Sequence, residues 1–161
     1  HYLEAEALSK KLWLKYYSSM TLMTKIYIEI GEINKRGEKQ SNDKKTILLK
    51  TSKLLVNATE KVNCNKTEAY RIRALAFAMN NQSDKASKYF QKSIEFAIWY
   101  GGKLELSRTY FELGKFLLNP ETKKKKLSGL TGNDYLEKAR QLFIEMDLSY
   151  DLAELETFMN K

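Results

Sequence analysis

The chain has 161 residues, of which 43% are hydrophobic and 30% are charged, a balance typical of a folded domain and unlike that of a disordered or membrane-embedded chain. No apolar run approaches the roughly 20 residues that a membrane-spanning helix needs. The net charge of +8 rests on 23 lysines and only five arginines. Nucleic-acid-binding surfaces favour arginine, because arginine reads bases and binds phosphates in bidentate fashion. We therefore interpret the lysine excess first as a bias in amino-acid composition and only second as a sign of a nucleic-acid-binding surface.

Apolar residues recur at helical spacing along nearly the whole chain and predict an all-α fold of about seven or eight helices. We expect the first two helices over residues 2–17 and 20–34, with a break at Ser18 and Ser19. A polar segment separates them from a third helix over residues 44–60. No alternating pattern typical of a strand competes with these helices.

The C-terminal half predicts five more helices, and the short turns between most of them favour antiparallel neighbours. Thr67 is the expected N-cap of the first, the glycine pair at 101–102 ends the second, and Pro120 ends the third. Asp134, with Glu137 three residues later, predicts a capping box at the start of the fourth. The five helices cover residues 68–79, 84–100, 103–118, 134–147 and 149–159, with a long basic loop over residues 119–133.

One helix-pair pattern occurs twice in this half of the chain. In its first helix a small residue follows an aromatic one by four positions, and its second helix places an aromatic residue four positions after a small one. The first copy comprises Tyr70, Ala74 and Phe77, then Ala86, Phe90 and Ser93; the second comprises Tyr110, Leu113, Gly114 and Leu117, then Ala139, Phe143 and Met146. The pattern resembles the tetratricopeptide repeat, with repeats over residues 68–100 and 103–147 and an insertion over residues 119–133.

The resemblance implies antiparallel helix-turn-helix repeats stacked in a right-handed superhelix, an αα solenoid in which small residues let the helices cross closely. Residues 1–161 would then form a single domain. A weaker third copy begins at Tyr27 and Gly31, with residues 44–60 as its second helix. The sequence departs from the family at Arg73, where the family prefers leucine.

The C-terminal run over residues 135–153 has a narrower resemblance. It is similar to the last repeat and closing helix of the helical arms of large bacterial signalling proteins, which follow an ATPase module. The resemblance implies a cytoplasmic regulatory or scaffolding arm. The chain also starts at His1, inside a helix and without a cap, so we expect a piece of a longer protein.

The usual catalytic and metal-binding residue types are scarce. His1 is the only histidine and Cys64 the only cysteine, so a histidine-assisted nucleophile or a cluster of metal ligands is not expected. The segment 101–103 lacks the glycine spacing of a phosphate-binding loop. The sequence therefore predicts no enzyme, no metal and no cofactor.

In the family, ligands lie along the concave surface formed by the first helices of successive repeats. Arg71, Arg108 and Lys115 would clamp an acidic peptide there, and Phe111 would supply an apolar anchor. The alternative is that the charges are solvated and that Phe111 packs against a neighbouring helix. The candidate groove residues are Glu68, Arg71, Leu75, Arg108, Phe111 and Lys115.

A second candidate surface is the lysine run in the basic loop. It is either a solvated loop or a contact for an acidic partner, a membrane surface or nucleic acid. Trp13 and Trp99 are expected to serve packing between helices rather than binding. The run comprises Lys123, Lys124, Lys125 and Lys126.

The favoured interpretation is a non-catalytic module for protein–protein interaction, binding an acidic peptide or helix and contacting neighbouring domains of the same parent chain. Three alternatives stay open. An effector-sensing arm that controls an adjacent ATPase or output domain would have an enclosed apolar pocket. A nucleic-acid-binding helical domain, less favoured, would gather lysine and arginine on one continuous face. Exposed terminal helices would allow a homodimer.

Overall fold

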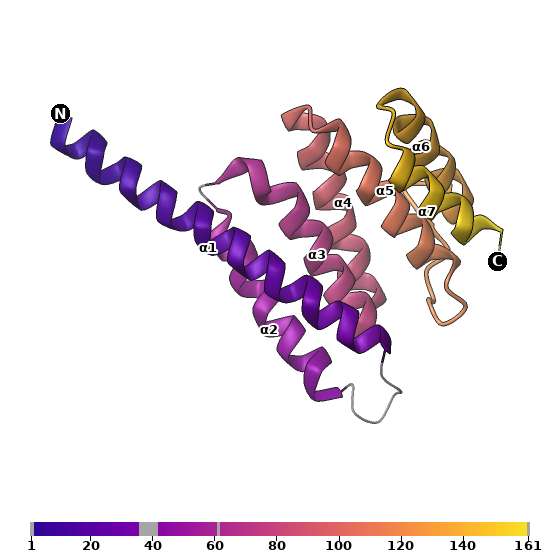
Figure 1. Ribbon diagram of the computed structural model, residues 1–161. Coiled ribbons are helices and arrows are strands. Elements are labelled where there is room, and N and C mark those ends of the chain that lie inside the picture. Colours follow the sequence, from indigo (N-terminus) through magenta and orange to yellow (C-terminus); the bar gives the residue numbers. More distant parts are fainter. Residues whose placement is uncertain (1, 36–41, 61, 161) are drawn as a thin grey trace.

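The computed structural model describes residues 2–35, 42–60 and 62–160. Within these residues the fold is all-α, with seven α-helices, a short 3₁₀ turn and one two-stranded hairpin (Figure 1). Each α-helix packs on the next in chain order, and α3 also contacts α5. The α-helices are α1 (Tyr2–Lys35), α2 (Asn42–Ala58), α3 (Lys66–Met79), α4 (Ser83–Tyr100), α5 (Lys103–Leu118), α6 (Gly132–Glu145) and α7 (Ser149–Met159); the 3₁₀ turn is η2 (Asn63–Asn65) and the strands are β1 (Lys126–Leu127) and β2 (Leu130–Thr131).

The predicted break at Ser18 and Ser19 is wrong, because α1 is one continuous helix of 34 residues. The Ser19 hydroxyl donates to the carbonyl of Tyr16 and accepts a hydrogen bond of 2.8 Å from the Asn65 amide. A serine that bonds back to its own helix does not have to interrupt it. Buried Ser19 therefore joins α1 to the segment before α3, while the N-terminal part of α1 extends beyond the other helices (Figure 1).

Two helix starts differ from the sequence prediction. Helix α3 begins at Lys66, so Thr67 lies buried in its first turn and is not its N-cap. Helix α6 begins at Gly132, and its capping box pairs Thr131 with Asp134, three residues before the predicted pair. The end of α4 is as predicted: Gly101 has φ 75°, a left-handed conformation that glycine adopts without strain.

The predicted close crossings are present in the two C-terminal helix pairs. Ala74 of α3 and Ala86 of α4 are fully buried. A Cβ added at Gly114 of α5 would lie 2.6 Å from Leu136 of α6, so only glycine allows this approach. Gly31 has no such neighbour within 4 Å, which corrects the idea that it permits a close crossing of α1 and α2.

The predicted loop over residues 119–133 contains an ordered hairpin, a correction to the strand-free prediction. Lys126 pairs with Thr131 and Leu127 with Leu130, with a turn at Ser128 and Gly129. Leu127 is buried, and its carbonyl accepts a hydrogen bond of 3.1 Å from the Tyr135 hydroxyl. The hairpin is therefore fixed to α6, although periodicity gave no sign of it.

None of the helices in the described ranges is long and apolar enough to cross a membrane. The longest, α1, includes several lysines and polar residues along its length.

Candidate binding site

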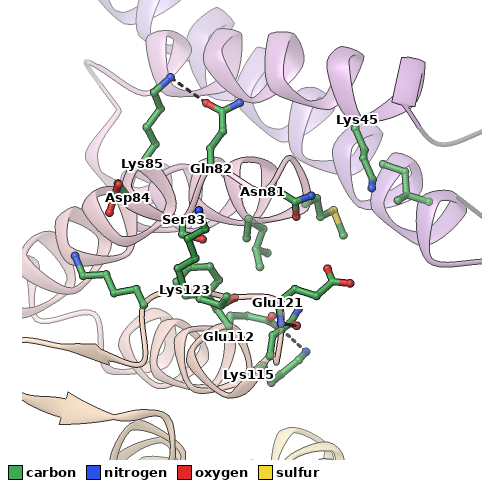
Figure 2. A pocket seen from close by; sticks show the side chains of 18 residues that line it. Lys45, Asn81, Gln82, Ser83, Asp84, Lys85, Glu112, Lys115, Glu121 and Lys123 are labelled. Atoms are coloured by element: carbon green, nitrogen blue, oxygen red, sulfur yellow. Dashed lines mark hydrogen bonds and ion pairs between the residues drawn. The ribbon is translucent and has the colours of Figure 1, made fainter.

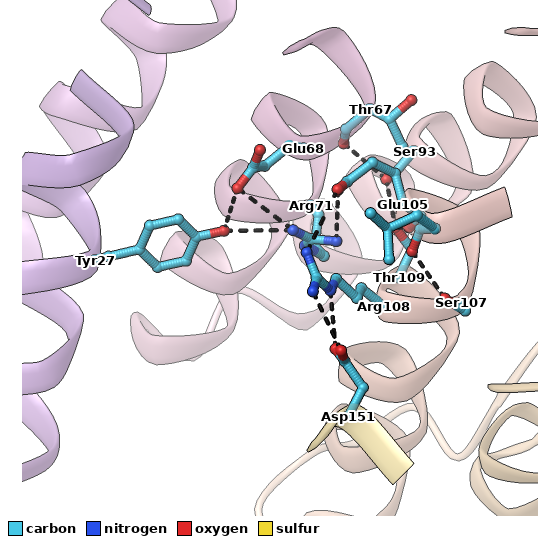
Figure 3. Close-up of polar contacts among 11 residues, drawn as sticks. Tyr27, Thr67, Glu68, Arg71, Ser93, Glu105, Ser107, Arg108, Thr109 and Asp151 are labelled. Carbon is cyan, nitrogen blue, oxygen red and sulfur yellow. Dashed lines mark hydrogen bonds and ion pairs between the residues drawn. The ribbon is translucent and has the colours of Figure 1, made fainter. Parts of the chain in front are cut away.

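A chain of polar contacts links the odd-numbered helices (Figure 3). The Tyr27 hydroxyl of α1 donates to Glu68 of α3, and Arg71 of α3 forms an ion pair of 2.8 Å with Glu105 of α5. We call this set the polar seam. It comprises Tyr27, Glu68, Arg71, Glu105, Arg108 and Asp151.

The seam ends in a bidentate ion pair between α5 and α7. Arg108 donates to the two carboxylate oxygens of Asp151 at 2.9 and 3.2 Å. This hydrogen bonding raises the pKa of Arg108, a shift that burial partly opposes. The pair fixes α7 against α5, because a guanidinium fork constrains both position and orientation.

Arg71 occupies the centre of the seam and is only 4% exposed. Burial alone would lower its pKa, but the charges of Glu105, Tyr27 and Glu68 outweigh burial and raise it. Burial of the Tyr27 hydroxyl raises its pKa to about 12; Arg71 opposes that shift and Glu68 adds to it. Arg71 is thus a permanent cation surrounded by internal partners.

These contacts correct the predicted clamp. Glu68, Arg71 and Arg108 do lie close together, but the carboxylates of the protein itself already pair with both guanidinium groups. A ligand carboxylate would have to displace Glu105 or Asp151. The seam is therefore suited to holding the helices in place.

Phe111, the predicted anchor, is 4% exposed and lies in the core between α5, α6 and α7. Its ring packs edge-on against Phe143 and Phe158. Helix α7 covers the side of α5 on which the anchor was expected, so the alternative of packing against a neighbouring helix is the correct one.

The other predicted groove residues lie in a separate cleft with a volume of about 980 Å³ (Figure 2). It lies where α3 and α5 end and α4 begins, and Leu75 and Lys115 line it. We call this feature the cleft. Its apolar lining consists of Ile33, Leu75, Ala78, Met79 and Phe116.

Lysines outnumber acids in the lining of the cleft by five to three. Lys115 is paired with Glu112 at 2.9 Å and lies 4.7 Å from the centre of the Phe111 ring. In the described ranges, the remaining lysines have no carboxylate within ion-pair distance. The five are Lys45, Lys85, Lys115, Lys123 and Lys124, and the acids are Asp84, Glu112 and Glu121.

The structure divides the predicted lysine run. Lys123 and Lys124 line the cleft. Lys125 turns back to donate to the carbonyls of Asn119 and Pro120, and Lys126 is exposed on β1. The first half of the run therefore lies at the cleft, whereas Lys125 forms hydrogen bonds within the loop.

Sequence reasoning missed Tyr27, Glu105 and Asp151 as partners of the two arginines. One signal was present: the pattern Lys-x-Glu-x-x-Arg occurs over residues 66–71 and again over residues 103–108. Glutamate and arginine three positions apart share a helix face, so a repeated pair on two neighbouring helices indicates a contact between them.

Among the described residues, no group of three or more histidine, cysteine, aspartate or glutamate side chains could hold a metal ion. His1 lies outside the described residues. No protein-family model, curated protein or solved structure matches the chain.

Proposed function

We propose that this chain is a non-catalytic, tetratricopeptide-like binding module that holds an acidic segment of a partner protein in the cleft. The observation that carries the proposal is the composition of the cleft, which combines an apolar lining with four lysines that have no carboxylate within ion-pair distance among the described residues. Such a surface offers burial for apolar side chains and charge for carboxylates around them.

The repeat assignment is supported by the packing of the two C-terminal helix pairs. The α3–α4 and α5–α6 pairs both cross at small residues, and α3 contacts α5 as first helices of adjacent repeats would. In this proposal the module is a cytoplasmic regulatory or scaffolding arm of a bacterial signalling protein, and neighbouring domains of the parent chain are further partners.

The cleft also explains why an extended ligand is favoured. Its lining comes from the ends of α1, α3 and α5, the starts of α2 and α4, the turn between α3 and α4 and the loop after α5, so it lies across several elements. A segment crossing it would meet Lys85 at the start of α4 and Lys123 in the loop after α5 (Figure 2). Lys124 also lines the cleft.

The test is selection of random 12-residue peptides displayed on phage. The target is the wild-type protein, with counter-selection on a variant that carries Lys85→Glu, Lys123→Glu and Lys124→Glu. The enriched peptides should combine Asp or Glu with apolar residues, and fluorescence anisotropy should show at least a ten-fold loss of affinity in the variant. The control carries Lys11→Glu, Lys50→Glu and Lys53→Glu, which make the same charge change at exposed positions outside the cleft. Equal weakening by both variants would reject the cleft as the binding site.

A further inference from the structure

A continuous row of aromatic rings runs along α3 and α4. Phe77 contacts Tyr89, Tyr89 contacts Tyr70, and Tyr70 contacts Phe96, with ring centroids 5.5, 6.1 and 6.3 Å apart. Phe96 then contacts both residues at the end of α4. We call this set the aromatic row; its members are Phe77, Tyr89, Tyr70, Phe96, Trp99 and Tyr100.

Four cations lie over the rings of the row. Arg73 lies 4.2 Å from the centre of Phe77, and Lys85 lies 5.6 Å from the same ring. Lys92 lies 5.2 Å from Tyr89, and Lys66 lies 5.2 Å from Phe96. Within the described parts of the chain none of these cations forms an ion pair with a carboxylate, so their charge is not neutralised as it is in the polar seam.

The row is buried at Phe77, which is 7% exposed and belongs to the core, and it is open at its C-terminal end. Trp99 is 71% exposed, which corrects the expectation that it serves helix packing, and Tyr100 is 51% exposed. Neither of these two rings carries a cation over its face among the described contacts. Trp13, on α1, is also exposed at 56%, but it belongs to a separate ring cluster with Tyr16 and Tyr17.

We propose that the aromatic row binds single-stranded nucleic acid without sequence preference. Bases stack on aromatic rings and phosphates pair with cations, so a surface that interleaves the two along one line fits an unpaired strand. Lysine supplies charge for phosphates without the bidentate base reading of arginine, so no sequence preference is expected.

The arrangement favours a strand over the other polyanions. The carboxylates of an acidic peptide would use the lysines, but they cannot stack on the rings as the bases of a strand can. A helix that binds a lipid surface keeps its cations and its apolar side chains on separate faces, whereas here lysines lie over the rings themselves. A duplex hides the faces of its bases and would gain only the charge.

Binding requires the lysines to move and Arg73 to stay. Arg73 is held by hydrogen bonds to the Leu49 carbonyl and to the Ser52 hydroxyl of α2. Lys66 and Lys92 have only long contacts, so their flexible side chains can turn from the rings to phosphates. The freed ring faces of Phe96 and Tyr89 then become available to bases beside Trp99.

The test is fluorescence anisotropy with a labelled single strand of about 12 nucleotides, within the range that such surfaces cover. The duplex of the same strand and anionic phospholipid vesicles serve as competitors. We expect the strand to bind and the duplex to bind at least ten-fold more weakly. Trp99→Ala should weaken strand binding about ten-fold. The double variant Lys66→Gln, Lys92→Gln should weaken it and flatten the dependence of log K on log salt by about 1.4, since each lost contact contributes about 0.7.

Matched controls come from α1, where Trp13→Ala and the double variant Lys11→Gln, Lys15→Gln make the same changes outside the row. They should leave affinity unchanged. In Trp13→Ala the only tryptophan is Trp99, so bound strand should quench its fluorescence. No binding of the strand at low salt, equal binding of the duplex, equal loss in the α1 controls, or binding of vesicles alone would each overturn the proposal. None of these variants alters a residue that lines the cleft, so the result does not depend on the proposed peptide binding.

Discussion

The polar seam and the aromatic row both include a cation on α3, but they differ in whether that cation is paired with carboxylates. In the seam, Arg71 is buried and paired with carboxylates from α3 and α5. In the row, Lys66 and Lys92 lie over aromatic rings without a carboxylate partner among the described residues. A fully buried cation must be paired to be tolerated, whereas a half-buried lysine can stay solvated without a carboxylate partner. The difference teaches that pairing with carboxylates fixes the cations of the seam, and it is the reason why both proposed binding surfaces are built on lysines without such a partner among the described residues.

Removing the central cation of the seam should have the largest effect on stability. Arg71→Met removes the buried cation that pairs with Glu105 and Glu68, and breaking a buried pair in this way costs about 3 kcal/mol. Urea unfolding followed by circular dichroism would measure the loss. The exposed, 3.8 Å pair of Arg140 with Glu156 supplies the control, since Arg140→Met should cost less than about 0.5 kcal/mol. Equal losses in the two variants would contradict a special role for the seam.

A second change disturbs the position of α5 without altering any charge. Gly114→Ala would push a Cβ to within 2.6 Å of Leu136, and overpacking of this kind costs about 2 kcal/mol. Gly31→Ala is the matched control, because open space surrounds that position and alanine favours the helix by about 1 kcal/mol. Opposite shifts in the melting temperature would confirm that α5 and α6 cross closely and that α1 and α2 do not. A melting temperature unchanged by Gly114→Ala would contradict that packing.

The seam also predicts a pH dependence at its α1 end. The pKa of Tyr27 is raised to about 12, so the contribution of its protonated hydroxyl is fully present below the unfolded value near 10 and is lost as pH rises toward 12. Tyr27→Phe should therefore cost about 1 kcal/mol at pH 8 and progressively less above pH 10. Absorbance of tyrosinate should also lose one late-titrating group in this variant. A cost that stays constant up to pH 12 would contradict the link between the protonated hydroxyl and the stability of the seam.

The row should have only a small effect on stability. Lys66→Gln with Lys92→Gln removes three cation–π contacts made by two half-buried lysines, each contact worth about 0.5 kcal/mol, so the free energy of unfolding should change by at most about 1.5 kcal/mol. Urea unfolding at two salt concentrations would test this, and a loss as large as that of Arg71→Met would mean that these lysines hold the fold.

The sequence predicted the helices well where local signals were strong. Helix α5 has the predicted bounds because Gly-Gly precedes it and Pro120 follows it, and α7 also agrees. The continuity of α1 was not predictable from Ser18 and Ser19, since the sequence does not show that the Ser19 hydroxyl bonds back to Tyr16 and accepts from the distant Asn65. The hairpin at residues 126–131 was not predicted, because two strands of two residues each are too short to show the alternating pattern of a β-strand.

The candidate site was predicted only in part. The sequence identified the groove residues on α3 and α5 but not which of them are buried. It does not show that α7 covers Phe111 or that Glu105 contacts Arg71. Leu75, Lys115, Lys123 and Lys124 do line one cleft. Contacts between residues far apart in the sequence determine which cations already have a carboxylate partner. The only sign of these contacts in the sequence is the repeated Glu-x-x-Arg pattern.

The most direct test measures unfolding free energy and peptide affinity on the same two variants, Arg71→Met and the triple variant Lys85→Glu, Lys123→Glu, Lys124→Glu. The account predicts that Arg71→Met loses about 3 kcal/mol of stability but keeps its affinity for a selected acidic peptide. The triple variant should keep its stability within about 1 kcal/mol and lose at least ten-fold in affinity. A folded Arg71→Met protein that fails to bind, together with a triple variant that still binds, would contradict the division between a seam that holds the fold and a cleft that binds.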